Sequence, residues 1–239
     1  MHCFLKETQT LKNSNIHYLN PFFVIIFFTS RLCTYVSSNK NIIQEIYKSL
    51  VMFNKVKILI VGPSESGKTV LANFLADATE SASGDYHPTQ GVRILEFEVD
   101  NVNLGGNHTV NIEVELWDCS GNQRFEICWP AMQKDVNGII FVYNPDVSSH
   151  EKELENWHLH FVKGKGIRDK LYHIFAHQKP ATNPSGRTKL GGSLGRIHVT
   201  NTNLEEDPDA VRSSFKSFLT QVISHVNDRR DQEELSIIE

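Results

Sequence analysis

The sequence lacks the features that identify a disulfide-stabilised, lipid-anchored or strongly basic protein. It has only four cysteines in 239 residues, and none of them forms a Cys-x-x-Cys pair. We therefore expect no disulfide framework and a reducing, cytosolic compartment. No cysteine follows Cys128, which predicts no C-terminal prenylation and no direct lipid anchor. The formal net charge of −4 gives no general attraction to polyanions, so we expect no nucleic-acid partner.

The N-terminal region lacks a membrane-length apolar run and differs in composition from the rest of the chain. Its apolar run, residues 22–28, has seven residues, whereas a helix that spans a bilayer needs about 20. Residues 1–51 also contain no glycine, alanine or aspartate. Met52 stands just before the first predicted strand. We therefore expect 1–51 to be an N-terminal extension, poorly ordered or an artefact of the gene model.

A phosphate-binding loop is the most specific feature that the sequence does contain. Gly62, Gly67, Lys68 and Thr69 match the pattern G-x-x-x-x-G-K-[ST], with an apolar strand before it and a helical pattern after it. The glycines let backbone N–H groups turn toward phosphates, and the helix N-terminus adds its positive dipole end. Lysine then reaches the phosphates and threonine binds Mg²⁺. The predicted nucleotide-binding residues of this loop are Gly62, Pro63, Ser64, Glu65, Ser66, Gly67, Lys68, Thr69 and Val70.

A second motif, Asp118-x-x-Gly121, follows a predicted strand and favours a nucleotide-dependent switch. In this arrangement the carboxylate holds Mg²⁺, directly or through water, and the glycine N–H contacts the terminal phosphate. Thr89 lies in the loop before the strand predicted at 92–100, where its hydroxyl is able to complete the metal site. We therefore expect Thr69, Thr89 and Asp118 to be the metal ligands, and Thr89 and Gly121 to contact the nucleotide.

From Lys55 onward, strand and helix patterns alternate, which predicts an α/β P-loop NTPase fold. We expect a six-stranded, mostly parallel sheet with one antiparallel edge strand and helices on both faces. Glycine and proline in 178–195 predict a loop in place of a crossover helix before the last strand. The expected domain covers 52–228, followed by a charged tail, 229–239. The predicted strands are 55–61, 92–100, 109–117, 138–143, 172–177 and 196–200, and the predicted helices are 68–78, 125–134, 149–163 with a Ser149 cap, and 208–226 with an Asp207 cap.

The order of elements and the two motifs resemble the Ras-like small GTPases. The runs 62–75, 88–98 and 115–119 further resemble the Rab-like GTPase subunit of intraflagellar transport complex B. This resemblance implies a Ras-like G domain that binds GTP or GDP with Mg²⁺. It also implies docking on the coiled-coil subunits of that complex, a role in cilium assembly, and a location in the cilium or flagellum and in the cytoplasm near the basal body.

Three positions depart from the pattern of an active Ras-like GTPase. The residue after Gly121 is Asn122, with Gln123 one place later, where the family has the glutamine that orients the attacking water. Ser64 replaces a common glycine, and its side chain is expected to crowd the terminal phosphate. Gln178 and Lys179 are expected to contact the nucleotide base. They stand where the guanine-reading motif N-K-x-D begins, but the fourth position is Ala181 and the aspartate is missing.

These departures leave three functions open. The first is a nucleotide-binding docking or regulatory module with weak intrinsic hydrolysis, in which Asn122 and Gln123 are only candidates for positioning water. The second is an active GTPase switch that needs an activating protein. A P-loop small-molecule kinase is the third, and the position of Asp118-x-x-Gly121 argues against it.

Overall fold

The computed structural model describes residues 55–78, 87–105, 109–162, 171–178 and 190–238. The chain divides into two units, Met1–Phe53 and Asn54–Glu239, and all described residues belong to the second. The expected N-terminal extension lies outside the described residues. Most of the expected loop before the last strand, residues 179–189, lies outside them as well.

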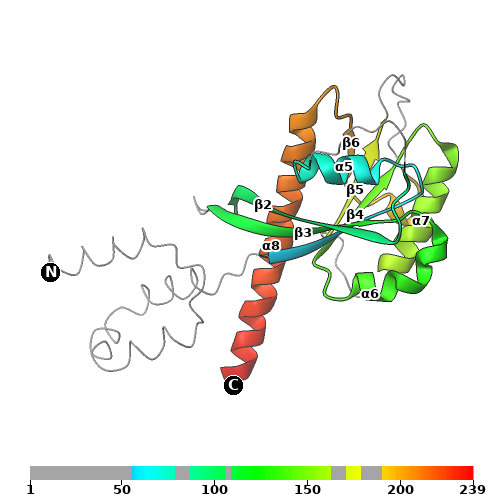
Figure 1. The fold of residues 1–239 in the computed structure, drawn as a ribbon. Coiled ribbons are helices and arrows are strands. Elements are labelled where there is room, and N and C mark those ends of the chain that lie inside the picture. Colours follow the sequence, from blue (N-terminus) through cyan, green and yellow to red (C-terminus); the bar gives the residue numbers. More distant parts are fainter. Residues whose placement is uncertain (1–54, 79–86, 106–108, 163–170, 179–189, 239) are drawn as a thin grey trace, which may run out of the picture. The chain divides into compact units, whose positions relative to one another are not determined.

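A six-stranded sheet forms the centre of the described unit, in the order β2-β3-β1-β4-β5-β6 (Figure 1). β2 pairs antiparallel with β3 and forms one edge, and the other neighbouring strands pair in parallel. The expected mostly parallel sheet with one antiparallel edge strand is confirmed. The strands are β1 (Lys55–Val61), β2 (Val92–Asn103), β3 (Thr109–Cys119), β4 (Gly138–Tyr143), β5 (Tyr172–His177) and β6 (Val199–Thr202).

Helices cover both faces of this sheet (Figure 1), and the central strand β1 shows why two cores form. Successive residues of a strand point to opposite faces. Ile58 and Ile60 accordingly join the core beneath α5 and α8, whereas Leu59 and Val61 join the core beneath α6 and α7. Within the described residues, no helix combines the length and apolarity needed to cross a membrane. The helices are α5 (Lys68–Leu75), the 3₁₀ turn η1 (Gln123–Cys128) leading into α6 (Trp129–Gln133), α7 (Ser148–Val162), the 3₁₀ turn η3 (Gly192–Leu194) and α8 (Pro208–Ile238).

Several predicted ends were wrong by a few residues. α5 ends at Leu75 instead of near residue 78. Ser149 lies inside α7 and does not cap it, because a turn in which Val147 N–H donates to Asn144 O starts the helix earlier. β6 begins at Val199, since Ile197 N–H is held in a turn by Leu194 O.

The last helix is also longer than predicted. Its start is as expected: Asp207 Oδ1 accepts a hydrogen bond from Ala210 N–H at 2.9 Å, and Pro208 is the first helical residue. The helix continues to Ile238 and includes the segment predicted to be a tail. Residues 227–238 contain no glycine or proline, and Arg229 pairs with Glu233 one turn later at 3.6 Å. Such pairs and straight-chain residues support a helix without an apolar face.

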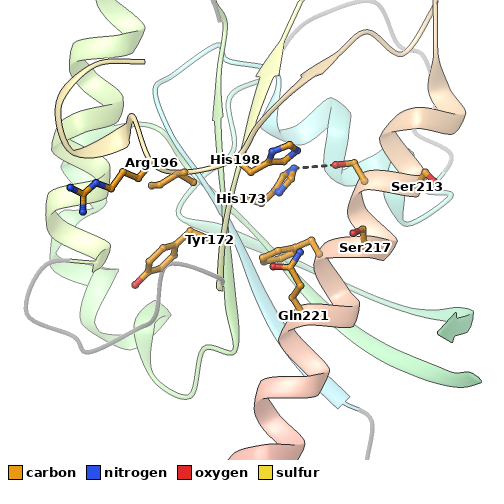
Figure 2. A pocket seen from close by; sticks show the side chains of 10 residues that line it. Tyr172, His173, Arg196, His198, Ser213, Ser217 and Gln221 are labelled. Atoms are coloured by element: carbon orange, nitrogen blue, oxygen red, sulfur yellow. Dashed lines mark hydrogen bonds between the residues drawn. The ribbon is translucent and has the colours of Figure 1, made fainter. Parts of the chain in front are cut away.

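A hollow lies at the starts of β5 and β6, beside α8 (Figure 2). His173 is 6% exposed there, and its Nε2 lies 3.0 Å from Thr200 Oγ1 and 3.1 Å from Ser214 Oγ. Burial, together with the neighbouring His198, lowers the pKa of His173 to about 4. The predicted phosphate-binding loop follows the carboxyl end of β1, whereas His173 is near the amino end of β5, so the two lie at opposite ends of the parallel strands.

His173 should make the stability of the protein depend on pH. In the unfolded chain the histidine takes up a proton near pH 6.5, whereas in the folded protein it resists until about pH 4. As the pH falls from 6.5 to 4, we expect the free energy of unfolding to drop by up to about 3 kcal/mol from this group. Urea unfolding across this range should show a shallower pH dependence for His173→Gln than for the wild type. The exposed His87, changed to Gln, is the control, and an unchanged slope in His173→Gln would contradict the prediction.

Candidate functional site

The phosphate-binding loop connects the buried strand β1 to α5. Gly62 and Gly67 have φ angles of 146° and 89°, and Glu65, whose side chain is exposed, has a φ of 61°. A left-handed conformation is unfavourable for a residue with a side chain by about 1–2 kcal/mol. The surrounding structure therefore holds the loop in a tight turn, in which Ser64 is exposed and Ser66 is buried.

Lys68 is the first residue of α5 and is 6% exposed. Its Nζ donates to Pro63 O, and it lies 3.4 Å from Ser66 Oγ. Burial lowers the pKa of Lys68 to about 8, and the charge of Asp118 opposes this shift. The ammonium group is thus held across the loop at the position where it is able to meet a phosphate.

Three predicted metal ligands from distant parts of the chain converge beside Lys68. Thr69 Oγ1 donates to Asp118 Oδ2 at 2.8 Å, and Thr89 Oγ1 donates to the same oxygen at 3.3 Å. The two threonine hydroxyl oxygens are 2.9 Å apart. α5, the segment before β2, and the end of β3 therefore bring their oxygen atoms to one point.

The surroundings of Asp118 fit a divalent cation. The side chain is fully buried, and among the described residues its Oδ1 has no hydrogen-bond partner. Burial raises the pKa of Asp118, while the Thr69 hydroxyl and the charges of Lys68 and Arg93 act in the opposite direction. Two hydroxyls and a carboxylate are hard oxygen donors, which Mg²⁺ prefers. The role of these residues as metal ligands stays a prediction.

Arg93 is a site residue that the sequence reasoning missed. It lies opposite Asp118 in the antiparallel register of β2 and β3, with its Nε 3.9 Å from Asp118 Oδ2. Its Nη2 donates to Asn73 Oδ1 on α5. The sequence did contain a signal. Arg93 shares the inward face of β2 with Leu95 and Phe97, because side chains two positions apart point to the same side of a strand, and a charge on that face needs a partner.

The two predicted switch segments contact each other and the phosphate-binding loop. Ser120 N–H donates to Gly91 O at 2.8 Å, and Arg124 Nη2 donates to Gln90 Oε1. A Cβ atom added to Gly121 would come within 2.5 Å of Ser64 N. The Asp118-x-x-Gly121 loop therefore lies directly on the phosphate-binding loop, and only glycine permits this approach.

Other predicted residues lie around this centre without joining it. Val70, one of the predicted nucleotide-binding residues, is 55% exposed, because Leu71 and Ala72 occupy the buried face of α5. Asn122 Oδ1 accepts Arg124 N–H at 3.0 Å and caps η1. Gln123, inside η1, is exposed. These contacts do not orient either side-chain amide for positioning a water molecule.

The predicted base-reading residues are only partly described. Gln178 N–H donates to Thr202 O at 3.0 Å, so the end of β5 is tied to β6, whereas Lys179 lies outside the described residues. The preceding residue, His177, was not singled out from the sequence. A Cβ atom on Gly67 would come within 2.2 Å of its ring, and its Nδ1 lies 3.1 Å from Thr202 Oγ1. His177 thus connects β6 to the phosphate-binding loop.

Known proteins share this fold and sequence. The family model described as Roc, the Ras of Complex domain of DAPkinase, matches residues 57–177. The intraflagellar transport protein 22 homologs of Danio rerio and Homo sapiens are 48% and 44% identical to this chain over 185 residues, which cover 77% of this chain and 98% of each relative. The intraflagellar transport protein 22 of Trypanosoma brucei is 30% identical over 189 residues, with 71% and 86% covered.

Solved structures of the trypanosome protein give the same result. The GTP-bound crystal structure of T. brucei IFT22/74/81 includes a chain that matches with a TM-score of 0.60 and 29% identity, covering 73% of this chain and 98% of that one. The GDP-bound T. brucei IFT22 crystal structure matches with a TM-score of 0.54 and 29% identity, with 71% and 97% covered.

Proposed function

The chain belongs to the family of Ras-like GTPases named intraflagellar transport protein 22, and from this premise we propose that it binds GTP and GDP with Mg²⁺ as a regulatory subunit of intraflagellar transport complex B. In this role it acts in cilium assembly as a docking module with weak intrinsic hydrolysis. Its location is the cilium or flagellum and the cytoplasm near the basal body.

The observation that carries this proposal is the convergence of Thr69, Thr89 and Asp118 next to the buried Lys68. Lys68 and the loop N–H groups would bind phosphate oxygens, and Thr69, Thr89 and Asp118 would hold the cation. Mg²⁺ neutralises phosphate charge when bound. The loop that contains Thr89 contacts the loop that contains Gly121. A bound terminal phosphate would therefore be able to order both segments.

The trypanosome relative supports the proposed nucleotide and partners. It has been crystallised with GTP, with GDP, and in an IFT22/74/81 assembly with GTP. We infer that the present chain docks on the corresponding coiled-coil subunits of complex B. The ordered switch segments give such a partner a surface that differs between the two nucleotide states.

Nucleotide binding by the full chain is the direct test. Calorimetric titration with GTP, GDP and ATP should show tight binding of both guanine nucleotides when MgCl₂ is present, and weaker binding when EDTA replaces it. The affinity for ATP relative to that for GTP tests the effect of the aspartate missing after Lys179, because that carboxylate would normally pair with guanine. If no guanine nucleotide bound in the presence of MgCl₂, the fold would be shared without the function.

Hydrolysis should be slow, and Asn122→Gln should accelerate it. Asparagine is one methylene shorter than glutamine, and here its Oδ1 is used to cap η1. Because water positioning is sensitive to about 1 Å, we expect the variant to raise the single-turnover rate about tenfold. Asn111→Gln is the matched control, since Asn111 Oδ1 also accepts a backbone N–H, from Asn101, away from the site. A wild-type rate as fast as that of an active Ras protein would contradict this prediction.

A further inference from the structure

Arg93 is the one guanidinium group that the described residues place against Asp118, and its position is fixed from two sides. Its Nη2 donates to Asn73 Oδ1 on α5, and Asn73 is buried, with 9% exposure. Its Nε lies 3.9 Å from Asp118 Oδ2, and 36% of the Arg93 side chain is exposed, compared with none of Asp118. The register of β2 and β3 sets Arg93 opposite Asp118. The hydrogen bond to Asn73 and the strand register therefore hold the Arg93 guanidinium group near the Asp118 carboxylate.

The same oxygen of Asp118 is the point on which the predicted metal ligands converge. Thr69 and Thr89 both donate to Oδ2, the atom that Arg93 approaches. A cation held by these oxygens and the guanidinium group would be like charges beside the same buried carboxylate, where such interactions are screened little. Arg93 must therefore weaken the binding of a divalent cation to some degree.

Without a divalent cation, the same charge has the opposite consequence for a bound nucleotide. An uncompensated Asp118 carboxylate would repel phosphate oxygens held by the adjacent loop. Arg93 offsets part of that negative charge, and its hydrogen bond to Asn73 also connects β2 to α5. Arg93, together with Lys68, therefore supplies positive charge at Asp118 when no divalent cation is bound.

We propose that Arg93 is a positioning residue that substitutes for part of the charge of Mg²⁺ at Asp118, so that the protein retains guanine nucleotide when Mg²⁺ is scarce and binds Mg²⁺ less tightly in return. This inference rests on the proposed nucleotide-binding function. Arg93 then has a regulatory effect. Nucleotide release depends less on Mg²⁺ than it would if the phosphate-binding loop acted without the Arg93 charge.

The test compares release of fluorescently labelled GDP from the full-length wild type, Arg93→Gln and Arg93→Lys, in MgCl₂ and in excess EDTA. We expect Arg93→Gln to release GDP about tenfold faster in EDTA and, because Mg²⁺ is bound more tightly, two- to threefold more slowly in MgCl₂. Arg93→Lys keeps the charge and should stay within about threefold of the wild type in the ratio of the two rates. Arg212→Gln is the matched control: Arg212 also pairs with a carboxylate, that of Asp77, and packs on α5 through Phe74.

The opposite signs in the two buffers separate this role from a structural one. If Arg93 only stabilised the fold, its loss would speed release in both buffers, and that result would overturn the proposal. So would an Arg93→Lys protein that behaves like Arg93→Gln, or a ratio that Arg212→Gln shifts equally. If the wild type bound no labelled GDP in MgCl₂, the proposed function would fail and this inference with it, whereas binding with an unchanged ratio in Arg93→Gln would refute the inference alone.

Discussion

Replacing Lys68 by alanine is expected to weaken the binding of Mg²⁺ and GTP by at least about 100-fold. The ammonium group is buried and is held by Pro63 O and Ser66 Oγ at the mouth of the loop. A hydrogen bond to a charged group contributes about 1.5–3 kcal/mol, and each 1.4 kcal/mol changes affinity about tenfold. We predict that Lys68 forms more than one such bond to phosphate oxygens. The affinity should be measured by calorimetric titration of the full-length variant.

Lys57→Ala is the control for the loss of a partly buried cation. Lys57 lies on β1, eleven positions before Lys68, where its Nζ donates to Lys134 O at 2.9 Å and lies 3.5 Å from the centre of the Trp117 ring. These contacts are structural, so this variant should change the affinity less than about threefold if it folds, a difference of well under 1.4 kcal/mol. An equal loss in both variants would mean that Lys68 acts through stability and not through phosphate.

Much of the fold was predictable because its signals are local. The apolar run 58–61 in β1 and the apolar residues of β4 indicate strands covered on both faces, and the alternation in β2 and β3 indicates strands with one face in water. Asp207 and Pro208 mark the start of α8. The meeting of Thr69, Thr89 and Asp118 was also predictable, since each follows or precedes an element whose place in this fold is known once the phosphate-binding loop is recognised.

What the sequence did not reveal depends on contacts between distant segments. Arg93 acquires its meaning only when the register places it opposite Asp118 and when α5 brings Asn73 to it. His177 matters because its ring fills the space beside Gly67, more than one hundred positions earlier in the chain. The extension of α8 beyond Val226 was missed for a different reason. Its residues have no apolar period, and the helix is supported there by backbone propensity and charge pairs.

Gly62→Ala is expected to cause the largest loss of stability among single substitutions in the phosphate-binding loop. Gly62 has a φ of 146°, and a Cβ atom built on it would lie 2.1 Å from Val142 O. That oxygen belongs to the backbone of β4, which pairs with β1 on one side and β5 on the other, so it has no room to retreat. The added methyl group must therefore separate β1 from β4 or distort the loop.

The comparison with Gly105→Ala isolates the steric part of this effect. Gly105 also has a positive φ, 100°, but a Cβ atom there would meet nothing within 4 Å. Its alanine variant should lose only about 1–2 kcal/mol, the cost of a left-handed residue. Gly62→Ala pays that cost and the clash, and we expect a total above about 4 kcal/mol, at the level of severe core substitutions. Urea unfolding of the full chain measures both. Equal losses would show that backbone conformation alone requires glycine at 62, whereas the predicted excess would show that the close approach of β4 to the loop fixes the geometry on which phosphate binding depends.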